Sequence, residues 1–507
     1  MDNLKEKIGF YVNFKFIPTL IALISFFVIL LIPHPAELSD KAWLMFAIFI
    51  ATMVGIIGKA ASVGVMALFA ITMITIFKAS APKITNGVAE VVTSKQAIQD
   101  ALASFSNELI WLIVISIIIS RAIIKTHLGE RIAYWFISAF GKKTLGIGYA
   151  LAMSETVLSP ITPSNTARAG AIIHPIMKAI AFVFGSDPEK GTQNKIGKYL
   201  ALVNMHGNPI SSAIFVTATA PNPLMVDYIN KVAGTSFHLT WGVWAYSMLI
   251  PGLAAMLLMP LIIYWLSPPE IKKTPAASQF AKEKMRELGK ISKAEKMMIG
   301  IFVLLLLLWA DIPSYIFGKS FVINPTATAI IGLFLVILTG ILSWEEAISE
   351  KAAWNTLFWF SGLVMMAEQL NKHGIIKWFS NTFQVWLENM HFGSFAVFIL
   401  LICVFLYTHY FFASTTAHIS AMGLAFLMVG AHVIQPSLLI PFFLMMIAAG
   451  NIMMGLTHFA TGTSPIIFGS NFVGMGEWWK VGFIMSVINL IVFGAAGAIW
   501  WKILGYY

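Results

Sequence analysis

Long apolar stretches recur along the chain and alternate with short polar segments. Three of them cover residues 16–32, 241–266 and 482–501. A helix needs about 20 apolar residues to cross the hydrocarbon core of a bilayer, which is about 30 Å thick. Because several stretches reach or approach this length, the pattern predicts an all-α polytopic membrane protein with about 11 transmembrane helices.

A polar motif interrupts the apolar pattern in each half of the chain. It reads SNTAR at 164–168 and STTAH at 414–418. A second matching pair, SNELIWL at 106–112 and WNTLFWF at 354–360, is separated by nearly the same number of residues. Landmarks that recur in order at a nearly constant offset indicate an internal duplication, which is common in secondary transporters.

Another polar break follows each motif. VTATAPNPL (216–224) and FATGTSPIIFG (459–469) interrupt apolar segments with small polar residues, glycine or proline. Such residues can serve close helix packing alone, but matched breaks in two halves are the best sequence indicator of a transporter's binding site. We therefore expect two inverted repeats with broken helices.

The first motif contains the residue types that end one helix and start another. Pro160 and Pro163 disfavour helix just before them, so we expect a helix to end near Ser159 and to restart near Ser164 or Asn165. Ser414 is the corresponding cap in the second copy, which lacks the prolines. A restarted helix presents free N–H groups and a positive dipole end, which together favour an anion.

Arg168 and His418 occupy equivalent positions, two residues after the last hydroxyl of each motif. A cation inside a bilayer is costly and normally faces a cavity or a partner. Arginine can bind a carboxylate through two N–H groups, and histidine can change its charge near neutral pH. The competing interpretations are an ion pair between Arg168 and Glu155 or snorkelling for Arg168, and a packing role for His418. Two matched cationic positions favour a substrate with two separated negative charges.

Composition and charge narrow the function classes. Hydrophobic residues make up 58% of the 507 residues and charged residues 11%, so a soluble domain is excluded. The net charge is +10, and the largest basic segment is a linker at 267–296 that also contains glutamates, which is typical of a solvated amphipathic segment and not of a nucleic-acid site. The positive-inside rule places this linker and the N-terminus in the cytoplasm.

Catalytic and metal-binding motifs are missing from the sequence. The chain lacks the zinc-protease, nucleotide-binding and hydrolase signatures, and its one cysteine, Cys403, permits no intramolecular disulfide. We therefore expect no enzyme activity and no cofactor, and transport driven by substrate or ion gradients. An anion channel is a weaker alternative, because the polarity is confined to paired breaks.

Four segments in order resemble the divalent-anion/sodium symporter family over essentially the whole chain: SPITPSNTARAG (159–170), SSAIFVTATAPNPL (211–224), YFFASTTAH (410–418) and GTSPIIFGSNF (462–472). The resemblance is greatest to the exchanger branch, which contains bacterial citrate/succinate and tartrate/succinate antiporters and chloroplast 2-oxoglutarate/malate translocators. The resemblance implies substrate contacts for Ser164, Asn165, Thr166, Thr219, Ser414, Thr415, Thr416, Gly462 and Thr463. Arg168 and His418 join these predicted substrate-binding residues because of their charge and their matched positions.

The resemblance also implies an architecture. It predicts a homodimer in which a scaffold domain (1–103 and 227–353) holds a transport domain (104–226 and 354–507) that moves like an elevator. Two re-entrant hairpins would begin near Ser104 and Trp354. The expected location is the inner or plasma membrane.

One departure from the family pattern concerns sodium. The second motif reads S-T-T where sodium-coupled members have S-N-T, so an amide oxygen is missing, while Arg168 and His418 add positive charge beside both motifs. A fixed cation makes an empty carrier costly to move across the membrane. We therefore expect a sodium-independent antiporter of di- or tricarboxylates such as malate, succinate, fumarate, 2-oxoglutarate or citrate. The alternative is a sodium-coupled dicarboxylate symporter of the same fold, since Na+ can still bind at Asn165.

Overall fold

The computed structural model describes residues 14–85, 88–234, 236–389 and 392–507, and this part of the chain is nearly all helical. Seven of its helices are long and apolar enough to cross a membrane, or eight if one bent pair counts as a single span. Shorter apolar helices accompany them. The predicted all-α polytopic fold is therefore confirmed. The predicted cytoplasmic location of the N-terminus concerns residues 1–13, which lie outside the described residues.

One compact unit contains the described residues up to Ile110 together with Trp354–Trp386. Within it, the amide oxygen of Gln369 accepts a hydrogen bond from the Ala81 N–H at 2.8 Å, and Gly362 approaches Ala67. Its elements are α2 (Phe16–Leu31), α3 (Asp40–Ile57), α4 (Val63–Phe77), the antiparallel strands β1 (Ile84–Thr85) and β2 (Val88–Ala89), α5 (Ser94–Leu102), η1 (Ala103–Ser106), α18 (Lys351–Lys372) and most of α19 (Ile375–Asn389).

The second unit contains Trp111–Ala353 and the described residues from Leu387 onward. It holds both polar motifs and both later breaks. Its elements are α6 (Glu108–Lys125), α7 (Leu128–Phe140), α8 (Thr144–Leu158), η2 (Thr166–Ile173), α9 (His174–Val183), η3 (Pro188–Lys190), α10 (Gly197–Ile214), η4 (Val216–Ala218), α11 (Asn222–Ala233), α12 (Trp241–Leu266), α13 (Pro275–Glu287), α14 (Lys293–Trp309), α15 (Ile312–Phe317), η5 (Lys319–Phe321), α16 (Pro325–Leu338), α17 (Trp344–Ile348), α20 (Ser394–Tyr407), η6 (Thr408–Phe411), α21 (Thr415–His418), η7 (Ile419–Gly423), α22 (Leu424–Val433), α23 (Pro436–Ile452), η8 (Met453–Gly455), α24 (Ser464–Phe468) and α25 (Met475–Ile503).

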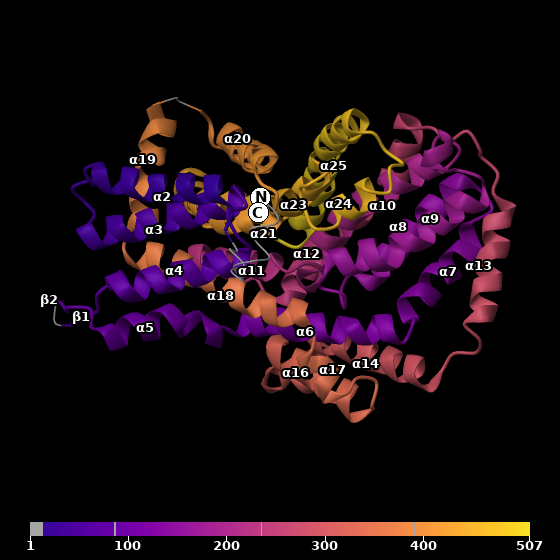
Figure 1. Ribbon diagram of the computed structural model, residues 1–507, viewed down its shortest axis with the longest axis horizontal. Helices are drawn as coiled ribbons and strands as arrows, with labels where there is room; N and C mark the ends of the chain where they lie inside the picture. Colours follow the sequence, from indigo (N-terminus) through magenta and orange to yellow (C-terminus); the bar gives the residue numbers. More distant parts are fainter. Residues whose placement is uncertain (1–13, 86–87, 235, 390–391) are drawn as a thin grey trace, which may run out of the picture. The chain divides into compact units, whose positions relative to one another are not determined.

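Helix α10 lies at the centre of the second unit. Helices α8, α9, α12 and α23 all pack against it, and α8, α9 and α10 lie side by side in Figure 1. Every α10 residue except Lys198 is buried. A helix that is buried on all sides needs partners for each of its polar side chains. Its asparagine, serine and histidine residues therefore face other protein groups.

The basic linker contains an ordered amphipathic helix. Helix α13 packs against α7, where the Ser278 hydroxyl donates to the Ser138 carbonyl at 2.6 Å and the rings of Tyr134 and Phe280 meet edge to face. At the following helix, Ser292 and Glu295 form a capping box that starts α14. The linker therefore belongs to the folded unit, with its lysines directed outward.

The two segments predicted to begin re-entrant hairpins differ from each other. Near Ser104, the chain bends by 48° between η1 and α6, because the Asn107 side chain accepts the Leu109 N–H at 2.9 Å and starts a new helix. The counterpart Asn355 lies inside α18, which runs without a break from Lys351 to Lys372. Helix α18 therefore begins close to Trp354, and a turn at residues 373–374 leads from it into α19. The division into scaffold and transport domains stays a prediction.

Candidate functional site

The first motif is a helix restart. Helix α8 ends at Leu158, and the Ser164 hydroxyl then accepts the Ala167 N–H at 3.1 Å while the Ser164 carbonyl accepts the Arg168 N–H at 3.0 Å. The new helix opens with the π-helical turns of η2, a conformation that is frequent at functional sites. The predicted break and restart are confirmed.

The second motif has the same local structure. The Ser414 hydroxyl accepts the Ala417 N–H at 3.3 Å, and the Ser414 carbonyl accepts the His418 N–H at 3.1 Å. The helix again continues through π-helical turns, here η7. Equivalent bonds at equivalent positions agree with the duplication inferred from the sequence.

The two later breaks also occur where the sequence predicts them. The first separates α10 from α11 and contains η4, and the second separates α23 from α24 and contains η8. Asn222 links them: its amide donates to the Ser212 carbonyl at 2.7 Å, and its oxygen accepts from Asn451 of α23 at 3.0 Å. Both broken helices are thus tied together at their interruptions.

The first motif contacts the second break. The Asn165 amide donates to the Thr461 hydroxyl at 3.0 Å. Gly462 lies so close to Thr166 that an added Cβ would be 2.7 Å from the Thr166 hydroxyl. The glycine therefore permits this close approach. Thr461 was not among the predicted site residues, although it belongs to the TGT interruption that the sequence displays.

The second motif contacts the same break. The Thr415 hydroxyl donates to the Ala460 carbonyl at 3.5 Å. Segment 460–462 therefore lies against both motifs, which come from opposite halves of the chain. We call residues 164–166, 414–416 and 460–462 the tip cluster. Its partly or largely exposed members are Ser164, Asn165, Thr166, Ser414, Thr416 and Gly462, whereas Thr415 is buried. Two other predicted site residues, Thr219 and Thr463, are buried in the chain's later breaks.

Arg168 lies behind the tip cluster and is completely buried. All five N–H groups of its guanidinium meet an oxygen acceptor. The acceptors are Glu155 Oε1 (2.7 Å), the Thr162 carbonyl (2.7 Å), the Ala218 carbonyl (2.9 Å), Ser212 Oγ (3.0 Å) and Ser211 Oγ (3.3 Å). Of the interpretations drawn from the sequence, pairing with Glu155 is the one the structure shows. Direct contact between Arg168 and a substrate stays a prediction.

Glu155 and Asn208 complete this buried cluster. Glu155 Oε1 also accepts a hydrogen bond from the Asn208 amide at 2.7 Å. Asn208 and the two serines lie on α10 and are not among the predicted site residues. The available signal was the helical spacing of Asn204, Asn208 and Ser211 along an otherwise buried helix.

His418 is also completely buried, between the rings of Phe405 and Phe412 at centroid distances of 4.8 and 4.5 Å. Its Nδ1 is 3.0 Å from Nδ1 of His409. His409 was not predicted, although it precedes the motif by a few residues. His418 therefore does not reach the surface of the tip cluster in this structure, and its contact with substrate stays a prediction.

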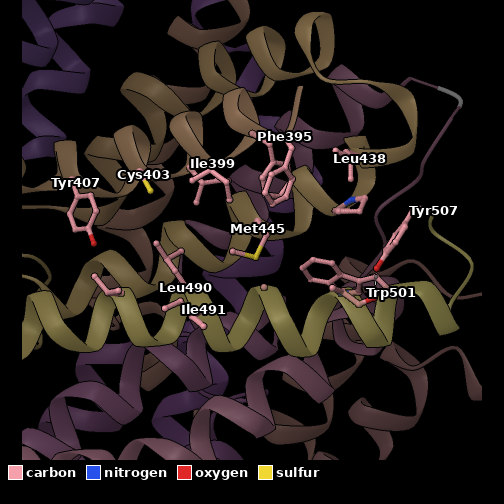
Figure 2. A pocket seen from close by; sticks show the side chains of 16 residues that line it. Phe395, Ile399, Cys403, Tyr407, Leu438, Met445, Leu490, Ile491, Trp501 and Tyr507 are labelled. Atoms are coloured by element: carbon pink, nitrogen blue, oxygen red, sulfur yellow. Dashed lines mark hydrogen bonds between the residues drawn. The ribbon is translucent and has the colours of Figure 1, made fainter. Parts of the chain in front are cut away.

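A separate cavity of about 560 Å³ lies between α20, α23 and α25. Figure 2 shows that aliphatic and aromatic side chains line it, including Ile399, Met445 and Ile491. Among the described residues, those that line this cavity carry no charge. A dianion would lose its hydration there without gaining hydrogen bonds, so the polar tip cluster is the better candidate site.

Comparison with known proteins places the chain in a family. The sequence model described as "Sodium:sulfate symporter transmembrane region" matches residues 13–507. The chain is 44% identical to YflS of Bacillus subtilis (strain 168), whose name assigns it provisionally to malate transport, over 97% of both chains. It is 36% identical to the chloroplast protein "Dicarboxylate transporter 1" of Spinacia oleracea, over 96% of this chain and 81% of that protein.

A solved structure supports the fold independently. The MtrF structure of Neisseria gonorrhoeae, whose title describes antimetabolite efflux pumps, aligns with a TM-score of 0.56 at 13% identity and covers 95% of this chain and 97% of that one. At this identity the likeness concerns the fold alone. Together with the family match over nearly the full length, these findings show that the chain belongs to the sodium:sulfate symporter family and is a membrane transporter, not an enzyme.

Proposed function

We propose that this protein is a sodium-independent antiporter that exchanges one di- or tricarboxylate for another by an elevator-type movement. The expected substrates are malate, succinate, fumarate, 2-oxoglutarate or citrate. The names of the relatives, which specify malate and dicarboxylates, support this substrate class.

The convergence of the two motifs carries the proposal. Two restarted helices reach the same segment, 460–462, and each presents small hydroxyl side chains at its N-terminus. Helix N-termini bind carboxylates through free N–H groups and a positive dipole end. Two such ends from opposite halves suit a short molecule with a carboxylate at each end.

Sodium independence is supported by the contacts of Arg168. Its guanidinium fills a cage of five oxygen atoms from Glu155, Thr162, Ala218 and two serines. Hard cations such as Na+ prefer oxygen ligands. Here the N–H groups of Arg168 already donate hydrogen bonds to those oxygens, so the oxygens are not free to bind Na+. In the second half of the chain, Nε2 of His409 similarly donates to the Ala460 carbonyl at 2.9 Å.

Exchange has a different physical basis in this geometry. Glu155 neutralises Arg168, so the pair contributes no net charge to the empty carrier. The remaining cost of moving an empty carrier comes from the partly exposed polar groups at the two helix starts, which would lose their contact with water. These groups are expensive to bury without hydrogen bonds. A bound dicarboxylate would satisfy them, which favours movement of the loaded carrier.

Counterflow in proteoliposomes tests the proposal. Uptake of labelled succinate or malate should require an internal dicarboxylate and should persist when potassium replaces all sodium. Strong uptake into empty vesicles that follows a sodium gradient would refute exchange. That result would establish the sodium-coupled symporter, which the family description and the intact Asn165 favour as the second candidate.

We also propose a homodimer in the inner or plasma membrane with the 267–296 linker in the cytoplasm. A cysteine placed at Arg286 on α13, in a Cys403→Ser background, should react with an impermeant maleimide only from the cytoplasmic side. Mass measurement of the detergent-solubilised protein by light scattering tests the dimer.

A further inference from the structure

The hydrogen bonds around His409 and His418 limit where their protons can lie. Nε2 of His409 is 2.9 Å from the Ala460 carbonyl oxygen. A carbonyl only accepts, so this nitrogen carries a proton. The two Nδ1 atoms are 3.0 Å apart, and two lone pairs would repel at this distance. One proton must therefore lie between the two rings.

The remaining ring nitrogen contacts Thr408. Nε2 of His418 is 3.2 Å from the Thr408 hydroxyl oxygen. That hydroxyl has one proton, and it already lies 2.9 Å from the Val404 and Phe405 carbonyls of its own helix. If its proton goes to the helix, Nε2 of His418 must donate. In that case the two rings share three N–H protons and carry one positive charge, whereas donation from Thr408 to Nε2 leaves the rings with two protons and no charge.

In the part of the chain that the structure describes, no anion next to the pair compensates such a charge. The rings are packed by Phe405 of α20, by Phe412, and by Met453 of η8, whose sulfur is 3.1 Å from Nδ1 of His418. Neither ring contacts a carboxylate among the described residues. A buried charge without a partner is costly.

The other titratable groups near the two histidines have contacts of their own. His206 of α10 faces Gly455 of η8, and Tyr407 of α20 is hydrogen-bonded to Ser486 of α25 at 3.2 Å. Arg168 and Glu155 neutralise each other. The third proton therefore needs a negative charge from outside the protein.

The second motif connects the pair to the tip cluster. The Ala460 carbonyl accepts hydrogen bonds from both His409 and Thr415, and His418 lies one helical turn after Ser414. A carboxylate held by the start of this helix would thus be adjacent to the pair. Its negative charge would stabilise the three-proton state.

We propose that His409 and His418 form a proton-binding site that is linked to carboxylate binding at the second motif. The pair takes up one proton from solution when the carboxylate binds and returns it when the carboxylate leaves, without any covalent step. Substrate and proton then move together through the membrane. This inference rests on the proposed function, because it requires a carboxylate at the tip cluster.

Calorimetry measures the proton directly. Succinate binding to the full-length protein would be titrated, without sodium, in two buffers of different ionisation enthalpy at about pH 7.5, where carboxyl groups of ordinary pKa are ionised. The difference between the two heats gives the number of protons taken up. We expect about one proton per bound succinate in the parent protein.

Two substitutions at one position separate the roles of His409. In His409→Asn, the amide oxygen replaces the Nδ1 acceptor, so His418 keeps its partner and proton uptake should persist. In His409→Gln, the amide nitrogen keeps the bond to Ala460 but the acceptor is lost, so uptake should fall toward zero. His418→Gln should also abolish uptake. His432→Gln is the matched control, because His432 is exposed near the end of α22 and bonded only to its own helix at Met428.

The outcomes are distinguishable. Succinate binding without proton uptake in the parent protein overturns the inference and leaves the proposed function intact. Undiminished uptake in His418→Gln also overturns it, because the proton would then bind elsewhere. No binding of any dicarboxylate overturns the proposed function, and the inference falls with it.

Discussion

Replacing Glu155 with glutamine tests the buried ion pair behind the tip cluster. The substitution keeps the shape of the side chain and removes its charge. Arg168 would then remain completely buried with four neutral acceptors and no counterion. Asn208 would also lose its charged acceptor.

The burial of this pair sets the expected loss of stability, and an exposed ion pair elsewhere in the chain provides a matched control. Breaking a buried ion pair by removing one partner costs about 3–5 kcal/mol, because the other charge stays buried without compensation. Asp227 and Lys231 on α11 form a pair with the same nitrogen–oxygen distance of 2.7 Å, but their side chains are 17% and 35% exposed. Asp227→Asn removes the same charge and should cost about 0.5 kcal/mol or less.

The free energy of unfolding in mixed detergent micelles is the assay. We expect Glu155→Gln to lower it by several times the effect of Asp227→Asn. In the double variant with Arg168→Gln, the loss should be smaller than the sum of the two single losses by about 2 kcal/mol, since no unpaired charge remains. Equal effects of about 1 kcal/mol or less for Glu155→Gln and Asp227→Asn would refute the reasoning.

Three further predictions concern single side chains. Gly462→Ala places a Cβ 2.7 Å from the Thr166 hydroxyl, so the KM of succinate exchange should rise on the order of tenfold. An unchanged KM would exclude this contact from the site. Ser414→Ala removes the helix cap at Ala417 and should lower the free energy of unfolding by about 1 kcal/mol together with transport; full transport would contradict a binding role for this helix start. Burial raises the pKa of Asp311, so its ionised form is disfavoured in the folded protein. Asp311→Asn should therefore stabilise the protein at neutral pH, and in a pH series of unfolding measurements this gain should vanish as the pH falls below the ordinary carboxyl pKa; a constant gain would contradict it.

Sequence reasoning located the interruptions of the helices because their causes are local. Two prolines and a serine cap act within one turn, so the end of α8 near Ser159 and the restart at Ser164 follow from a few adjacent residues. The second restart at Ser414 follows in the same way. The hairpin expected to begin near Trp354 stays a prediction; α18, which starts three residues earlier at Lys351, runs unbroken to Lys372 because this segment contains no proline.

The sequence was a weaker guide to which groups the buried polar side chains would hydrogen-bond. Glu155 was one of several interpretations for Arg168, and the acceptors Ser211 and Ser212 were not selected at all. They belong to α10, which packs beside α8 and α9 only in the folded chain. The same holds for His409, whose ring meets His418 across the turn that joins two helices.

The sequence by itself determined the membrane fold class, the duplicated motifs and the places where helices break, because helix length, proline and capping act over neighbouring residues. Tertiary structure decided that both motifs meet segment 460–462, that the charge of Arg168 is cancelled by Glu155, and that His418 shares a proton position with His409. Those outcomes depend on hydrogen bonds between side chains from separate helices. Burial then makes each choice of partner obligatory, since an unpaired polar group in the interior is too costly to retain.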